Sequence, residues 1–529
     1  MFLFGPLWRK DSRHIGALII ACLLCGAASV RAQTSDYQAA TSLVQQGQFE
    51  RAIALLEQVV GRSPGDLKAR NLIGIALSAA GRRDEANEQF QKAVALDPNF
   101  VPALKNLAVN ELAAGRLEQA AIHFEKVLKS VPVDQACHWG LAEIAFARRD
   151  FQRAVDHYEQ SGELSLREPS TTIRFASSYA ETKQSSKAVA LMQKVPLGLD
   201  ANAQFQAGLL LAKLERYEEA ARRFELARKT YPDPYQVGYN LVLVLVRSRD
   251  YDAAVRTGEE LLAAGHRKAE LYNLMAAAYD RAGKTIEAYN SLRRATELEP
   301  NDETNYLDLI ALCLERQNYD LGLKIADLGV ELIPASGRLH LQRGVVLVMK
   351  GQFEEATTEF EISARTQPEP GLAYVAMGLA LIQMDKPEAA VEMLRRQIEK
   401  SPNNPRLWWL LGEGLTRGGA ASMSDAEREA IEALRKSIRL DPAISQPRAL
   451  LGKILLRRGD VGRAAEQLEK ALEIDPDDLT AAYQLAQALR KKGDTARANL
   501  LFARVDRAKS EGRDDTQRNL MQVIKAGSR

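Results

Sequence analysis

One position recurs along this chain at a nearly constant interval, and it holds alanine or glycine at every occurrence. Eleven of the thirteen intervals are 34 residues long, one is 32 and one is 40. A period of this length is typical of arrays in which one supersecondary unit is stacked on copies of itself. The recurring residues are Ala52, Ala86, Ala120, Ala154, Ala188, Ala220, Ala254, Ala288, Gly322, Ala356, Ala390, Ala430, Ala464 and Ala498.

Three further positions repeat in phase with this one. A large side chain such as Phe90 or Phe360 stands four residues after it in most repeats, and a small residue such as Gly74 or Gly344 stands twelve residues before it. Because two helices approach closely only where side chains are small, these positions indicate a helix crossing. In ten of the fourteen repeats a proline stands twelve residues after the recurring position, where it ends the second helix. Each repeat therefore predicts one helical hairpin.

Taken together, these positions resemble the tetratricopeptide repeat family. The segment 351–356, followed by Phe360 and Pro368, is similar to the second helix of that repeat, and the match covers residues 33–505. The resemblance implies an all-α fold, a right-handed superhelical solenoid of about fourteen antiparallel helical hairpins. Residues 506–529 are then expected to form a C-terminal capping helix and tail. We expect softer packing at Gly258, at Gly322 and at the insertion around residues 418–422.

The first 32 residues differ from the repeats. Three basic residues precede an apolar run from Ile15 to Val30, which ends in Val30-Arg31-Ala32. This pattern predicts that residues 1–32 are a secretory signal peptide cleaved before Gln33, and that the protein is secreted or periplasmic. An uncleaved membrane anchor and lipidation at Cys22 are the alternatives. Contact with a membrane is expected only through this segment.

Charge and cysteine content exclude several classes of protein. The 71 Lys and Arg residues nearly balance the 69 Asp and Glu residues, which leaves a formal charge of +2. No strong positive field is present to hold nucleic acid, so no nucleic-acid partner is expected. Beyond the predicted signal only Cys137 and Cys313 remain, without CxxC spacing. We interpret both as small buried hydrophobic residues rather than as a disulfide framework.

The sequence contains no recognisable catalytic or cofactor motif. It lacks a phosphate-binding loop, a His-Glu-x-x-His motif and a Gly-x-Ser-x-Gly turn. His123 and His157 occupy the same position in consecutive repeats, but no further ligand recurs with them, so we interpret them as packing or surface residues. The sequence therefore predicts no catalytic, cofactor-binding or metal-binding residue, no cofactor, and no enzymatic activity.

Binding is the remaining class of function. The family resemblance places one first-helix position of each repeat on the inner wall of the array, and six of the fourteen residues there are aromatic although aromatics make up 6% of the chain. Aromatic side chains offer large contact areas at low entropic cost, so we predict that they bind a partner. Packing between neighbouring first helices is the alternative. The aromatic candidates are Tyr37, Trp139, Phe205, Tyr239, Trp409 and Tyr483, and the polar candidates are Asn106, Arg174, Asn240, Arg247 and Arg281.

Some members of the family use lysine and asparagine on successive first helices to clamp a peptide's terminal carboxylate. The repeats that follow Asn106 and Asn240 lack the cations for such a clamp. We therefore predict a non-catalytic extracytoplasmic scaffold that binds a protein or an extended peptide in the concave groove. A subunit of an envelope assembly such as polysaccharide export, or a regulatory subunit of an enzyme complex, is the alternative. The sequence leaves the oligomeric state open.

Overall fold

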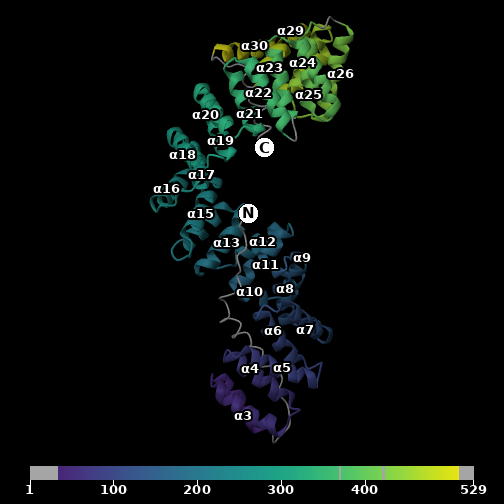
Figure 1. Ribbon diagram of the computed structural model, residues 1–529. Coiled ribbons are helices and arrows are strands. Elements are labelled where there is room, and N and C mark those ends of the chain that lie inside the picture. The colour runs from purple at the N-terminus through teal and green to yellow at the C-terminus, as the bar shows by residue number, and fades with distance from the viewer. Residues whose placement is uncertain (1–33, 368–370, 420–422, 511–529) are drawn as a thin grey trace. The chain divides into compact units, whose positions relative to one another are not determined.

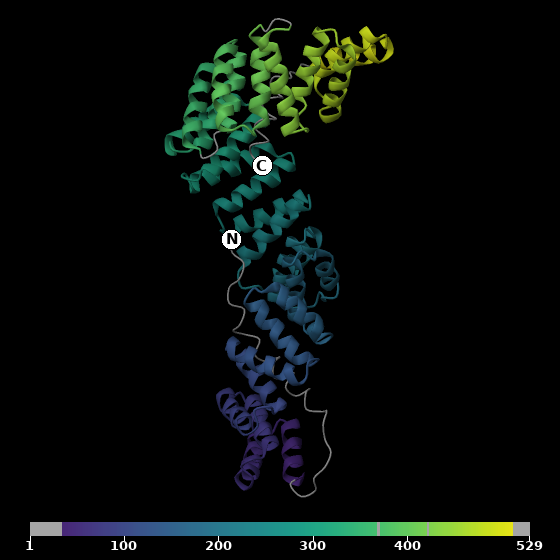
Figure 2. The same cartoon turned by 90° about the vertical axis from the view of Figure 1, so that its right-hand side faces the viewer.

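The computed structural model describes residues 34–367, 371–419 and 423–510, and these residues form 29 helices and no strand. With the exception of the short α10 (Leu164–Arg167), the helices pair along the chain into fourteen antiparallel hairpins (Figure 1 and Figure 2). The predicted all-α fold of about fourteen hairpins is confirmed. The predicted signal peptide and most of the predicted C-terminal tail lie outside the described residues.

The chain divides into two compact units, residues 1–261 and 262–529. The first unit has seven first helices: α2 (Thr34–Gln45), α4 (Leu67–Ala79), α6 (Val101–Ala113), α8 (Gln135–Ala147), α11 (Pro169–Glu181), α13 (Ala201–Lys213) and α15 (Pro234–Arg247). Their partners are α3 (Phe49–Arg62), α5 (Arg83–Leu96), α7 (Leu117–Ser130), α9 (Phe151–Ser161), α12 (Ser185–Met192), α14 (Tyr217–Ala227) and α16 (Tyr251–Ala263), which ends just past the division.

The second unit also has seven hairpins. Its first helices are α17 (Ala269–Arg281), α19 (Glu303–Glu315), α21 (Gly337–Met349), α23 (Gly371–Gln383), α25 (Pro405–Arg417), α27 (Gln446–Arg457) and α29 (Leu479–Lys492). Their partners are α18 (Thr285–Leu298), α20 (Tyr319–Leu332), α22 (Phe353–Thr366), α24 (Pro387–Lys400), α26 (Asp425–Leu440), α28 (Val461–Ile474) and α30 (Thr495–Ser510).

The small residue of each first helix lies against the large residue of the second helix of the same hairpin. A Cβ atom placed on Gly344 would stand 2.5 Å from Cε1 of Phe360, and one placed on Gly74 would stand 2.4 Å from Cε1 of Phe90. Neither ring has room to retreat because both are buried. The recurring small residues are therefore the contact points of the helix crossings, as predicted.

In the seventh hairpin, a different pair of residues makes the close contact between the two helices. Gly258 replaces the large residue there, and Leu261, three residues further along α16, instead lies against Gly238 of α15. A Cβ atom on Gly238 would stand 2.6 Å from a Leu261 methyl group. The next turn of the helix thus supplies the side chain that the sequence pattern lacks.

The connection between repeats depends on the proline and on the residues that follow it. In five repeats the proline carbonyl accepts a hydrogen bond of 2.7 to 3.1 Å from the side chain six residues later, which lies on the next first helix. The donors are Arg70, His138, Tyr306, His340 and Trp408. Two residues after the proline, an N-cap side chain such as Asp134 or Ser336 accepts a backbone N–H of that helix. Each repeat boundary therefore both ends one helix and fixes the start of the next.

The turn inside each hairpin contains a residue with a left-handed backbone, and the turn of the twelfth hairpin contains Met423 as a second one. A positive φ recurs at residues 47, 81, 115, 149, 183, 215, 249, 283, 317, 351, 385, 419, 459 and 493, so the turn follows the same period as the helices. Glycine, which adopts this conformation without steric cost, occupies eight of these positions.

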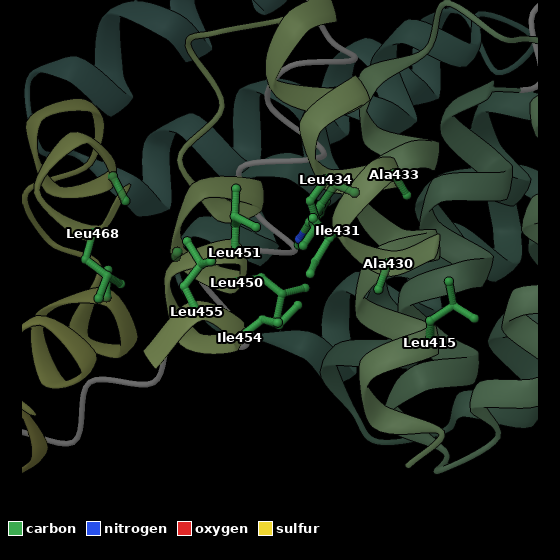
Figure 3. Packing of buried hydrophobic residues seen from close by; sticks show 14 of the residues in the cluster. Leu415, Ala430, Ile431, Ala433, Leu434, Leu450, Leu451, Ile454, Leu455 and Leu468 are labelled. Carbon is green, nitrogen blue, oxygen red and sulfur yellow. The ribbon is translucent and has the colours of Figure 1, made fainter. Parts of the chain in front are cut away.

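The segment that follows the insertion in the twelfth repeat makes hydrogen bonds to the thirteenth repeat. Glu427 of α26 is 1% exposed, accepts the N–H of Met423 at 2.8 Å and pairs with Arg457 and Arg458 of α27 at 2.5 and 2.7 Å. Nearby, Leu434 and Ile431 of α26 and Leu450 and Ile454 of α27 belong to one buried cluster (Figure 3). Residues 420–422 of the insertion, where we expected softer packing, lie outside the described residues, and next to them the structure shows a buried carboxylate with three hydrogen-bond donors.

Candidate binding surface on the first helices

The two sides of each unit are packed differently. In both units first helices of consecutive repeats contact one another, for example α4 with α6 and α25 with α27. Among the described residues, second helices make their main contacts with the flanking first helices and not with one another. First helices therefore lie on the inner, more closely packed side of each unit. We call this surface the first-helix wall of the unit.

Four of the six aromatic candidates keep part of their side chain exposed on this wall. Tyr37, Trp139 and Tyr239 are half-buried, and Tyr483 is 39% exposed. Tyr37 and Trp139 rest on the hydrophobic clusters beneath them, while the ring of Tyr239 lies 5.9 Å from that of Tyr235. Burial, followed by the charge of Asp66, raises the pKa of the Tyr37 hydroxyl, so this group stays protonated at neutral pH. Each of these four rings is therefore partly accessible on the first-helix wall.

The other two aromatic candidates are packing residues, and our prediction is corrected for them. Phe205 is 2% exposed, and its ring lies 5.6 Å from that of Phe224 and 4.4 Å from that of Tyr231. Trp409 is 6% exposed within the large cluster of the second unit. Both residues stand at the same repeat position as the other four aromatic candidates, but neighbouring side chains bury them. They therefore fit the alternative interpretation, in which these rings pack between helices.

The polar candidate Asn106 belongs to a row of contacts between first helices. Its Nδ2 donates to Oδ1 of Asn71 at 2.9 Å and so joins α6 to α4. One residue earlier, Lys105 pairs with Asp134 at 2.6 Å and joins α6 to the start of α8. Burial raises the pKa of the Asp134 carboxyl, but Lys105 and the N–H of Cys137 outweigh it and leave this pKa lowered. These side chains hold repeats together on the wall.

Arg174 takes part in a buried group that joins α8, α9 and α11. Its Nε lies 2.8 Å from Oε2 of Glu143, and the hydroxyl of Tyr158 donates to Oε1 of the same carboxylate at 2.7 Å. Burial, and then the charge of Glu143, raises the pKa of Tyr158 well above its ordinary value. The guanidinium of Arg174 is therefore already paired with a carboxylate inside the protein.

The remaining polar candidates are not brought together. Asn240 donates to the carbonyl of Gln236 on its own helix at 2.8 Å. Arg247 and Arg281 are exposed at the ends of α15 and α17. These three residues therefore do not form a common binding site.

The histidines make separate contacts. Nδ1 of His123 lies 2.7 Å from Oε2 of Glu111, whereas Nδ1 of His157 lies 3.0 Å from Nδ1 of His138. In the part of the chain that the structure describes, no group of three or more His, Cys, Asp or Glu residues has the geometry of a metal site. Within the same residues, no helix is long and apolar enough to span a membrane.

Sequence reasoning missed several residues that shape this wall. Asn71 and Lys105 stand in the same column as Tyr37 and Trp139, but the sequence does not reveal that they and Asn110 link first helices, because each polar pair occurs only once or twice in the array. A signal was present in the row of N-cap residues two positions after the prolines, which repeats with the period of the array. That row could have predicted where the wall begins in each repeat.

Comparison with protein-family models assigns most of these repeats. Three models, each described as a tetratricopeptide repeat, match the chain. Together they cover more than half of it, at residues 43–110 and 455–518, at residues 105–162, 205–270, 375–443 and 424–478, and at residues 269–302.

Two curated proteins show similarity over part of the chain. DnaJ homolog subfamily C member 3 of Gallus gallus is 21% identical over 254 residues, which are 43% of this chain and 49% of that protein. The Hsp70-Hsp90 organizing protein of Triticum aestivum is 21% identical over 300 residues, 57% of this chain and 47% of that protein. The chain thus spans about half the length of each relative. The crystal structure of yeast Tom70 covers 94% of this chain at 16% identity, with 95% of its own length and a TM-score of 0.40.

Proposed function

Since the chain belongs to the tetratricopeptide repeat family, we propose that it is a non-catalytic, extracytoplasmic scaffold that binds a protein or an extended peptide along its first-helix walls. One curated relative is named as an organizing protein for Hsp70 and Hsp90, which supports a role in protein interaction. The fourteen hairpins occupy residues 34–510, which leaves no separate catalytic domain within that span.

One observation carries this proposal. Tyr37, Trp139 and Tyr239 stand at one position of the first, fourth and seventh repeats, and each keeps part of its ring exposed on a first helix of the first unit. Because these rings are three repeats apart, they suit a ligand that extends along several repeats, and each ring can contact a different part of it. Large aromatic surfaces of this kind are common anchors in protein interfaces.

The extracytoplasmic location rests on the first 32 residues. Their basic start, apolar run and small residues before Gln33 follow the pattern of an exported precursor. N-terminal sequencing of the protein from its native cells tests this point, and a mature chain that begins at Gln33 is expected. A chain found in the cytoplasm with Met1 intact would contradict it.

Photo-crosslinking tests the binding surface. We would place benzoylphenylalanine at Trp139 or Tyr239 of the full chain and, as controls, at Ile122 of α7 or Ile286 of α18, which are 63% and 74% exposed on second helices. Crosslinks to the same partner are expected from the first-helix positions and not from the controls. Equal crosslinking from Ile122 and Ile286 would show that the partner does not bind on the first-helix wall.

A further inference from the structure

A pocket of about 270 Å³ lies in the second unit where the twelfth and thirteenth repeats meet. Arg406 and Trp409 of α25 form one side, and the loop 443–445 that leads into α27 forms another. The end of α28 closes it through Ile474 and Asp475. A pocket of this size is smaller than most sites for whole ligands, but it can hold a single side chain.

The cation in this pocket has no partner. No hydrogen bond or ion pair holds the guanidinium of Arg406 within the described residues, whereas most arginines of the second unit pair with a carboxylate. Burial lowers the pKa of this guanidinium, although the Asp441 carboxylate acts in the opposite direction. A half-buried arginine that no carboxylate bonds is poorly solvated, so an anion that enters the pocket gains a charge-assisted hydrogen bond.

A second polar group lines the pocket. Ser445 is 3% exposed and stands at the N-cap of α27, but its hydroxyl does not cap that helix. The pocket therefore opens at the N-terminus of a twelve-residue helix, where the helix dipole favours negative charge. Arg406 and Ser445 provide donors from two different elements.

The rest of the lining is apolar or already bonded. Ile444, Ile474 and the edge of Trp409 offer surface to methylene groups. Asp475 accepts the N–H of Asp477 at 3.1 Å and caps the end of α28. Its charge makes the pocket selective for a ligand that reaches Arg406 directly, since an anion bound nearer to Asp475 would be repelled.

We propose that this pocket binds the side chain of a glutamate from the partner segment, with the carboxylate at Arg406 and Ser445 and the methylene groups against Ile444 and Ile474. The inference rests on the proposed scaffold function and adds to it an acidic residue that the second unit recognises. The pocket lies beside the first-helix wall because Arg406 and Trp409 stand near the start of a first helix.

Binding of small probes to the full chain tests this proposal. We would titrate N-acetylglutamate N-methylamide and its glutamine counterpart, up to about 20 mM because single-side-chain contacts are weak, and follow binding by ligand-detected NMR. The glutamate compound is expected to bind at least about tenfold more tightly than the glutamine compound. No binding of the glutamate compound, or equal binding of the two, would overturn the proposal.

Variants separate the roles of the lining residues. Arg406→Gln is expected to weaken binding of the glutamate compound about tenfold or more, and Ser445→Ala by a smaller factor. Asp475→Asn keeps the oxygen that accepts from Asp477 and removes a nearby negative charge, so binding should become severalfold tighter. Arg365→Gln on α22, which is exposed and remote in sequence, serves as the matched control. Unchanged binding in Arg406→Gln would contradict the proposal.

The probe experiment and the crosslinking experiment test different proposals, so a negative result in one can be distinguished from a negative result in the other. If crosslinks map to the first-helix wall but the glutamate compound does not bind, only the pocket is disproved. If the compound binds through Arg406 but no crosslink forms on the wall, the scaffold proposal fails and the pocket remains a site for carboxylates.

Discussion

At the scale of single residues, six repeats hold a strained turn. Arg149, Lys183, Glu215, Arg249, Gln317 and Asp385 adopt the left-handed conformation that glycine adopts in the other eight turns. A side chain in this conformation costs roughly 1 kcal/mol because its Cβ approaches the backbone. The sequence showed glycine turn signals in some repeats, but only the backbone reveals that all fourteen turns share one conformation.

Replacing such a residue by glycine should stabilise the protein. We expect Glu215→Gly in the first unit and Gln317→Gly in the second to raise the free energy of unfolding by about 0.5 to 1 kcal/mol each. Gly115→Ala, which puts a Cβ on a residue with φ of 74°, should lower it. Urea denaturation measures all three, and a loss of stability in both glycine variants would contradict the strain argument.

The contact between the buried His138 and the half-buried His157 should make the first unit sensitive to acid. Burial, followed by the charges of His138 and Arg153, lowers the pKa of His157, whereas Asp156 and Glu125 raise it. Because this folded pKa lies below that of the unfolded chain, about 6.5, the unfolded state binds the proton first. Stability contributed by the neutral imidazole is therefore present above about pH 6.5 and is lost as the pH falls below it.

Denaturation at several pH values measures this effect. The urea midpoint of the natural protein is expected to fall between pH 7.5 and pH 5.5 by more than that of His157→Gln, whose amide does not titrate. Parallel curves for the two proteins would show that the histidine pair does not control the acid response.

At the scale of helices, the period of the sequence predicted the hairpins because the recurring residues lie where the two helices of each hairpin cross. Gly344 and Phe360 recur in register since each hairpin needs one close contact between its helices. The period could not reveal the bonds between Asn106 and Asn71, or between Glu427 and Arg457, because such pairs do not recur. The pocket at Arg406 was equally hidden, since its lining extends from α25 to Asp475 across two repeats. The buried candidates Phe205 and Trp409 show the same limit, because a column identifies a helix face but not what covers it.

Enlarging a crossing residue should disrupt its hairpin. Gly344→Leu would force its side chain into Phe360, and we expect a loss of about 2 kcal/mol or more in the free energy of unfolding. Gly462→Ala is the control, because that glycine lies in α28 with no atom within 4 Å of the added Cβ. The control should be neutral or stabilising by up to about 1 kcal/mol. Equal losses in the two variants would contradict the crossing model.

At the scale of the whole molecule, each hairpin contacts mainly its neighbours in the chain. Stability is then approximately a sum of repeat terms and neighbour terms, so that damage spreads only a short distance. The division into two compact units adds a boundary near residue 261. Local changes should therefore have local consequences.

Hydrogen exchange measured by mass spectrometry tests this locality. In Gly344→Leu, exchange is expected to accelerate in α20 to α23 and to stay unchanged in α2 to α9 of the first unit. Acceleration of equal size in both units would show that the array unfolds as one cooperative body.

The proline carbonyls that accept bonds from the next first helix also bear on how the protein would respond to mechanical force. Pulled from its two ends, an array with only neighbour contacts should yield one repeat at a time, and each released repeat of 34 residues would add roughly 11 nm of extended chain. Boundaries with such a bond, as at His340 and Trp408, should require higher force than the boundary before α6, where the residue six positions after Pro98 is Leu104, whose side chain has no hydrogen-bond donor. A scaffold built this way would lengthen under load while most of its first-helix wall stayed folded.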